Sequence, residues 1–131
     1  MTQRGNERRR IEEEGSGDEG EGVMATTPTE QVGTRLMFED ERVRVWDLAL
    51  APGESLEKHI HRLDYCYIVA SAGLIRFADP DNPDDYDDYQ FAEDEVVYIP
   101  VGDEGKVDNR LTNVGEKAHR NFVIELKRGG S

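Results

Sequence analysis

From Leu36 onward the chain alternates between short apolar runs and polar or glycine-containing turns. The runs are rich in β-branched and aromatic residues, and they fall at 43–50, 64–69, 74–77, 95–100 and 121–126. No stretch keeps the three- and four-residue apolar spacing of an amphipathic helix over three turns. Short strands separated by Gly, Pro, Asn and Asp clusters are typical of a sandwich or small barrel. We therefore predict one all-β domain over residues 31–131.

Residues 1–30 have a different composition. They hold almost no large apolar side chains, and a basic cluster at Arg8–Arg10 precedes an acidic, glycine-rich run at residues 12–22. Such a segment buries too little apolar surface to offset the entropy lost on ordering. We predict a disordered tail over residues 1–30, with Met24 as an alternative start of the chain.

A second polar stretch, residues 78–88, contains six aspartates and two prolines. Clustered carboxylates suit calcium, but the spacing and glycine of an EF-hand are absent. We expect a solvated hairpin loop there.

The charge balance excludes some partners. Asp and Glu number 29 against 16 Lys and Arg, which gives a net charge of −13. Nucleic acid and anionic membranes repel such a chain, so we expect neither as a partner. The single Cys66 excludes an intramolecular disulfide, and there is no apolar run of membrane-spanning length and no signal peptide with a hydrophobic centre. We expect a cytoplasmic protein.

The candidate chemistry lies at His59 and His61. One residue separates them, and in a β-strand this spacing points both imidazoles to the same face. Neutral imidazoles are ligands for divalent Fe, Mn, Ni, Cu and Zn. The pair predicts a transition-metal site, which needs further donors.

The surrounding sequence resembles the cupin superfamily, whose two motifs read G-x5-H-x-H-x3,4-E-x6-G and G-x5-P-x-G-x2-H-x3-N. The matching residues are Gly53, His59, His61 and Gly73 in the first motif, and Pro100, Gly102 and Asn113 in the second. The resemblance implies a single-domain jelly-roll β-barrel that binds a small molecule. It also implies a homodimer.

By the same resemblance, three His and one Glu hold the metal in this family. Here the Glu position falls on Tyr65 or Cys66, depending on the count, and the third His falls on Asn109. Asp64 and His119 are further candidate donors. Strand alternation places Tyr65 and Tyr67 on one face and Cys66 on the other, and we favour Tyr65 as the inward residue.

The predicted metal ligands are thus His59, His61, Tyr65 and Asn109. Tyr65 and His119 are the candidate proton-transfer groups, and Tyr67, Tyr98 and Trp46 are the predicted pocket lining. The function implied is metal-dependent oxygenase, isomerase or lyase chemistry on a small organic acid or aromatic. The alternative is a metal-free cupin that binds or senses a small molecule without catalysis.

Overall fold

A computed structural model describes residues 26–128 of the chain, so most of the predicted tail lies outside the described part. The described residues contain strands and no helix, which confirms the all-β prediction. Consequently no helix among them is long and apolar enough to cross a membrane. The strands are β1 (Arg35–Glu39), β2 (Val43–Leu50), β3 (Ser55–Leu56), β4 (His59–His61), β5 (Tyr65–Ser71), β6 (Gly73–Asp79), β7 (Asn82–Phe91), β8 (Val96–Ile99), β9 (Lys106–Asp108), β10 (Arg110–Asn113) and β11 (His119–Leu126).

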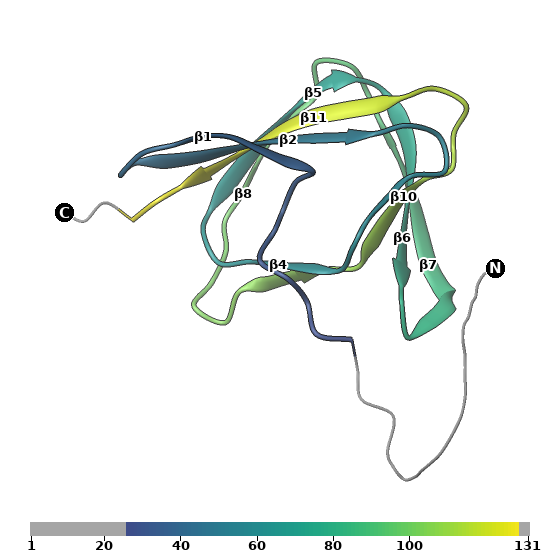
Figure 1. The fold of residues 1–131 in the computed structure, drawn as a ribbon, viewed down its shortest axis with the longest axis horizontal. Helices are drawn as coiled ribbons and strands as arrows, with labels where there is room; N and C mark the ends of the chain where they lie inside the picture. The colour runs from purple at the N-terminus through teal and green to yellow at the C-terminus, as the bar shows by residue number, and fades with distance from the viewer. Residues whose placement is uncertain (1–25, 129–131) are drawn as a thin grey trace, which may run out of the picture.

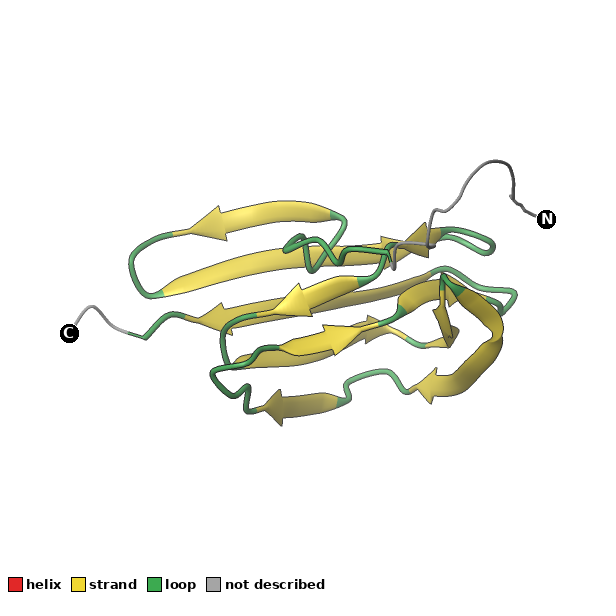
Figure 2. Ribbon diagram, turned by 90° about the horizontal axis from the view of Figure 1, so that it is seen from below, coloured by secondary structure: helices red, strands yellow, loops and turns green. Residues whose placement is uncertain are grey.

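These strands form a jelly-roll barrel of three antiparallel sheets. The largest has the order β1-β2-β11-β5-β8, a second has β3-β10-β6-β7, and β4 pairs with β9. In Figure 1 the strands surround the interior, with β2, β11 and β5 on one side and β4 on the other. Figure 2 shows the long strands of the barrel running alongside one another.

Period-two alternation builds the interior. In β11, buried positions alternate with half-buried ones, so that Asn121, Val123 and Glu125 share the inner face. Leu48 in β2 and Val69 in β5 lie directly across from Asn121, and both are buried. Adjacent strands that point their alternate residues inward close a common core, as expected for a sheet with one buried face.

The prediction of a loop over residues 78–88 is wrong for most of this stretch. Only Pro80 and Asp81 form the turn, and residues from Asn82 onward belong to the ten-residue strand β7. Pairing with β6 supplies the structure, and it includes an ion pair between Arg76 and Asp88 at 2.8 Å. Every β7 residue before Phe91 is exposed, so water solvates the carboxylates and no hydrophobic pattern marks the strand.

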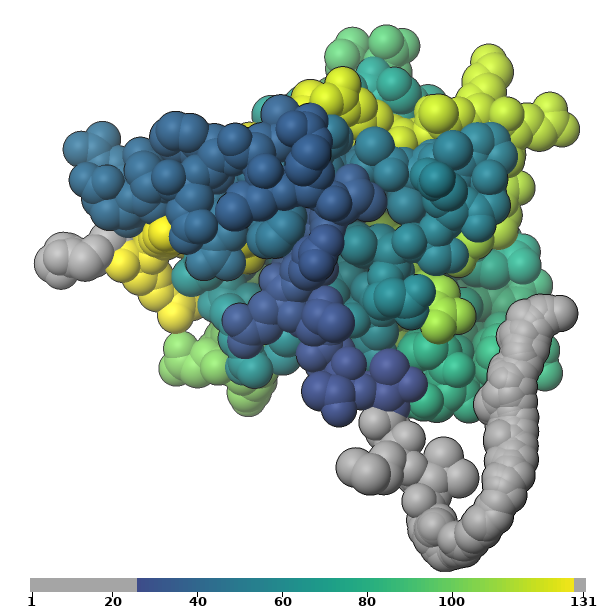
Figure 3. Space-filling view, in the orientation of Figure 1, coloured from purple at the N-terminus to yellow at the C-terminus, as the bar shows by residue number. Residues whose placement is uncertain are grey.

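The tail boundary also differs from the prediction. Thr29 bridges to β4: its N–H donates to the Lys58 carbonyl at 3.1 Å, and its carbonyl accepts from the Ile60 N–H at 2.7 Å. The ordered structure therefore starts before residue 31. Figure 3 shows this N-terminal segment, in dark blue, crossing the front face of the molecule toward the β1–β2 pair.

Candidate metal centre

The barrel contains an open cavity of about 530 Å³ that is lined mostly by apolar and aromatic side chains. This volume lies in the range of small-molecule binding sites. Its wall includes Leu48, Phe77, Phe91, Leu111 and Val123. Polar groups gather where β4 and β9 face the cavity, and they include His59, His61, Lys106 and Asp108.

The pairing of β4 with β9 brings these polar groups together. His59 lies opposite Asp108 and His61 opposite Lys106, with Ile60 facing Val107 between them. Since successive side chains of a strand point to opposite faces, both histidines and Asp108 point to the same side. Val107 on the other side is exposed.

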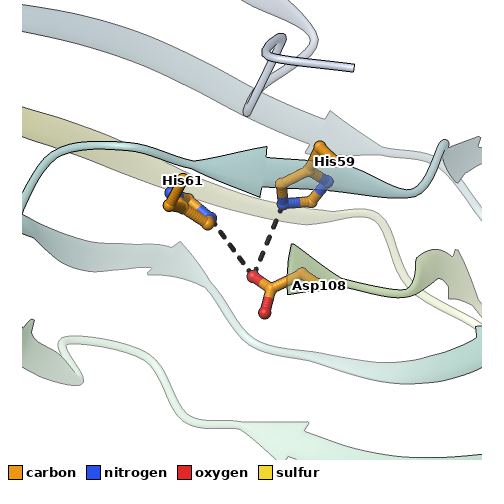
Figure 4. A group of neighbouring side chains, drawn as sticks. All are labelled: His59, His61 and Asp108. Carbon is orange, nitrogen blue, oxygen red and sulfur yellow. Dashed lines mark hydrogen bonds and ion pairs between the residues drawn. The ribbon is translucent and has the colours of Figure 1, made fainter. Parts of the chain in front are cut away.

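His59, His61 and Asp108 converge on one point. The Nε2 atoms lie 3.4 Å (His59) and 3.2 Å (His61) from the same Asp108 oxygen, Oδ2. Figure 4 shows the two rings and the carboxylate pointing toward one another. The three ligand atoms lie within 4.8 Å of one another, and both imidazoles are buried. This is the spacing of a group that can hold a metal ion.

The hydrogen bonds of His59 test whether a cation fits. Its Nδ1 lies 2.9 Å from the Glu57 carbonyl oxygen, which only accepts, so Nδ1 carries the hydrogen. The other ring nitrogen, Nε2, therefore faces the Asp108 carboxylate. Either a proton on Nε2 or a metal ion between Nε2 and Oδ2 makes this contact favourable. A backbone carbonyl on the other ring nitrogen is also the usual partner of a metal-bound histidine.

His61 is held differently. Its ring stacks on Tyr65 with centroids 3.9 Å apart, and its buried Nδ1 has no hydrogen-bond partner among the described residues. Burial lowers the pKa of His61 despite the nearby Asp108 carboxylate, which favours the neutral, ligating form. Burial alone would raise the pKa of Asp108, but the two imidazoles and the Lys106 ammonium outweigh it and hold that pKa well below its usual range.

Lys106 and Tyr65 border this group. The Lys106 ammonium donates to Asp108 Oδ1 and lies 3.4 Å from the Tyr65 hydroxyl. Tyr65 is buried and lines the cavity. Burial raises its pKa, so the hydroxyl keeps its proton at neutral pH. The arrangement favours a hydrogen-bonding role for Tyr65 over the phenolate ligand that the sequence predicted.

The other predicted donors lie elsewhere. Asn109 is half-buried between β9 and β10 and is outside the cavity wall, whereas its neighbour Asp108 faces the histidines. The sequence reasoning missed Asp108 because it counted back from Asn113. Asp64 accepts hydrogen bonds from the Val101 N–H and the Tyr98 hydroxyl. Cys66 is half-buried and is not part of the wall.

Of the three predicted lining residues, Tyr67 lines the cavity and the other two do not. Tyr98 is 55% exposed because its position in β8 points outward, where its hydroxyl donates to Asp64. Trp46 packs in the hydrophobic core, and its Nε1–H donates to the buried Glu125 at 2.8 Å.

His119 does not supply a third imidazole to the group. It is buried against Phe91, with ring centroids 4.9 Å apart, and is not part of the cavity wall. Its two ring nitrogens lie 2.9 Å from the Ser71 carbonyl oxygen and from Asn121 Nδ2. Both ring nitrogens thus have partners within the fold, so neither is free for the proton transfer that was predicted for His119.

Comparisons with known proteins find matches to this chain in structure but not in sequence. No family model matches the sequence, and neither does any curated protein. A cupin domain from Bordetella pertussis matches in structure with a TM-score of 0.59 and 20% identity, over 78% of this chain and 98% of that one. An RmlC-like cupin with a double-stranded β-helix fold, from Methanocaldococcus jannaschii, matches with a TM-score of 0.51 and 18% identity, over 81% and 94%.

The barrel and its enclosed polar group define a small jelly-roll protein with a candidate metal-binding cavity. More specifically, the chain has the cupin fold, as its two sequence motifs predicted. Identities of this size establish the fold alone, so the function is argued from the site.

Proposed function

We propose that this protein binds a divalent transition metal through His59 Nε2, His61 Nε2 and a carboxylate oxygen of Asp108. We further propose that it acts on a small organic molecule in the adjoining cavity. One observation carries the proposal: two buried imidazole nitrogens meet a single oxygen of the half-buried Asp108 carboxylate, and the other nitrogen of His59 already donates to a backbone carbonyl. The three ligand atoms face one point, as they would around a bound cation, and the backbone carbonyl on His59 Nδ1 orients that ring.

The donor set narrows the metal. Two imidazoles and one carboxylate are the protein ligands of non-haem Fe(II) oxygenases, in which other coordination positions stay open. Mn, Ni, Cu and Zn also accept this mixture of nitrogen and oxygen ligands. A bound ion of this kind supplies Lewis-acid or redox chemistry at the cavity wall.

The chain's own residues have separate tasks in this proposal. Lys106 engages Asp108 Oδ1 and thereby leaves Oδ2 free to ligate. The neutral Tyr65 hydroxyl, beside Lys106, is placed to hydrogen-bond a substrate oxygen or pass it a proton. The apolar wall excludes water and accepts an apolar or aromatic body. Oxygenation, isomerisation or lyase chemistry on a small organic acid or aromatic fits these parts.

Metal content tests the proposal. Untagged protein is reconstituted anaerobically with Fe(II), and separately with Mn(II), Co(II), Ni(II), Cu(II) and Zn(II), then desalted and analysed by elemental mass spectrometry. We expect about one equivalent of metal in the parent and an affinity loss of about 100-fold in Asp108→Asn, because a neutral amide oxygen replaces the anionic carboxylate oxygen. Asn109→Ala is the matched control, since this neighbouring side chain is outside the cavity wall, and it should retain the metal.

Two results would count against the metal. The first is a parent protein that holds no stoichiometric ion after reconstitution with any of the six, and the second is equal uptake by Asp108→Asn and parent. Either result would favour the metal-free alternative, in which the histidines hydrogen-bond a ligand directly. The cobalt form adds a spectroscopic check, because visible absorption bands of bound Co(II) report on the ligand set independently of turnover.

A further inference from the structure

Asn121 places a second polar group in the cavity wall, away from the histidines. It lies in the middle of β11, is 3% exposed and lines the cavity. Figure 1 shows β11 and β4 on opposite sides of the barrel interior. The Oδ1 atom of Asn121 is buried and has no hydrogen-bond partner among the described residues. Buried polar atoms are nearly always paired, so this atom requires an explanation.

A chain of hydrogen bonds fixes which way the amide points. His119 Nδ1 lies 2.9 Å from the Ser71 carbonyl oxygen, so Nδ1 carries the hydrogen and the neutral ring accepts at Nε2. Asn121 lies 2.9 Å from that Nε2 and must donate to it with Nδ2. The flipped amide would set two acceptors against each other. Burial lowers the pKa of His119, which keeps the ring neutral.

The surroundings offer Asn121 Oδ1 no donor from the side chains across the sheet. Its cross-strand neighbours are Leu48 and Val69, and Val123 is the next inward residue of β11. All three side chains are hydrocarbon. His119 cannot turn to help, because its ring is stacked on Phe91 and its Nδ1 is committed to Ser71. Asn121 is part of the cavity wall, so a molecule bound in the cavity is the candidate source of the missing donor.

We infer that Asn121 Oδ1 accepts a hydrogen bond from a hydroxyl or N–H group of the small molecule that the cavity binds. The ligand class is an apolar or aromatic body that carries such a donor, because hydrocarbon and aromatic groups form most of the wall. His119 is the positioning residue that holds the amide in this orientation. The inference deepens the proposed small-molecule function, but it needs no metal.

The test compares two probes of similar shape, phenol and anisole, by NMR titration of uniformly labelled protein in chelator-containing buffer. An apolar cavity without a donor requirement favours anisole, which is the more hydrophobic of the two. We expect phenol to bind at least about tenfold more tightly, a difference of about 1.4 kcal/mol. The Asn121 side-chain amide resonances should shift with phenol and much less with anisole.

Two variants locate the preference. Asn121→Leu keeps the volume and removes the acceptor, so the preference for phenol should disappear. Val123→Ala alters the same wall two residues along β11 and should retain it. A parent that shows no saturable phenol binding, or that binds anisole as well as phenol, overturns the inference, as does a preference that survives in Asn121→Leu. Each of those results would indicate that an ordered water, and not a ligand, is the hydrogen-bond partner of Asn121 Oδ1. Since chelated protein is used, failure of the metal proposal leaves this measurement unaffected.

Discussion

Replacing Gly73 by alanine should strongly destabilise the barrel. Gly73 is the first residue of β6, it is buried, and it is the closing glycine of the first sequence motif. A Cβ at this position would lie 2.4 Å from the Cβ of His119 and 2.9 Å from its Cγ. Carbon atoms in contact prefer about 3.5–4.0 Å, so the overlap exceeds 1 Å.

No small movement of a side chain removes this clash, so its cost in free energy of unfolding is large. His119 Cβ is fixed to the backbone of β11, a strand paired on both sides with β2 and β5. Rotating the imidazole moves the ring but leaves Cβ in place. Overpacking costs typically about 1–3 kcal/mol, and we expect the upper end, about 3 kcal/mol, here. For a domain of roughly 100 residues this corresponds to a Tm about 12–24 °C lower.

Urea unfolding followed by Trp46 fluorescence measures the change. Gly102→Ala is the matched control, because a Cβ there meets nothing within 4 Å, and its free energy of unfolding should stay within about 0.5 kcal/mol of the parent. A double-mutant cycle then isolates the contact. The penalty of Gly73→Ala should persist beside His119→Ala, which retains Cβ, and should largely vanish beside His119→Gly. Equal penalties in both backgrounds would refute the explanation.

Three further predictions concern the metal, the pH and a turn. Saturating Zn(II) at about 100 times its Kd should raise the free energy of unfolding of chelated protein by about 2.7 kcal/mol, and Asp108→Asn should show no such rise in thermal unfolding. The Arg120 guanidinium holds the pKa of Asp47 below its usual range, so the stability this carboxylate contributes is present at neutral pH and is lost as the pH falls below about 4. The gap between parent and Asp47→Asn in urea unfolding should therefore narrow from pH 6 to pH 3, and a constant gap would contradict it. Gly105→Ala should lower the free energy of unfolding by about 1–3 kcal/mol in the same assay. The reason is that Gly105 has φ +83° and that an added Cβ would lie 2.9 Å from Ile60 Cδ1. An unchanged urea midpoint would contradict this prediction.

The parts of the fold that the sequence predicted are those whose pattern reflects burial. β2 and β11 line the interior, so their apolar runs were recognisable as strands. β7 was missed because it is an exposed edge strand, and its aspartates are compatible with a loop as much as with a strand. Its conformation comes from pairing with β6, a tertiary contact that no local pattern encodes. The bridge from Thr29 to β4 was missed for the same reason.

The candidate metal centre was predicted in part, and the missing part depends on strand register. The spacing of His59 and His61 places them on one face whatever their partner strand is, because period-two alternation is a local property.

The third donor is different, since it depends on which residue of β9 lies opposite His59. β4 and β9 are not joined by a hairpin turn, so this register is set by a tertiary pairing and not by a local turn. A slip of one residue would turn Val107 inward and Asp108 outward, because pairing register decides which face each side chain occupies. Motif spacing indicated Asn109, and the pairing of His59 with Asp108 moves the candidate donor one residue back and changes it from an amide to a carboxylate. The change matters chemically, because an anionic oxygen binds a divalent ion far more strongly than a neutral amide does.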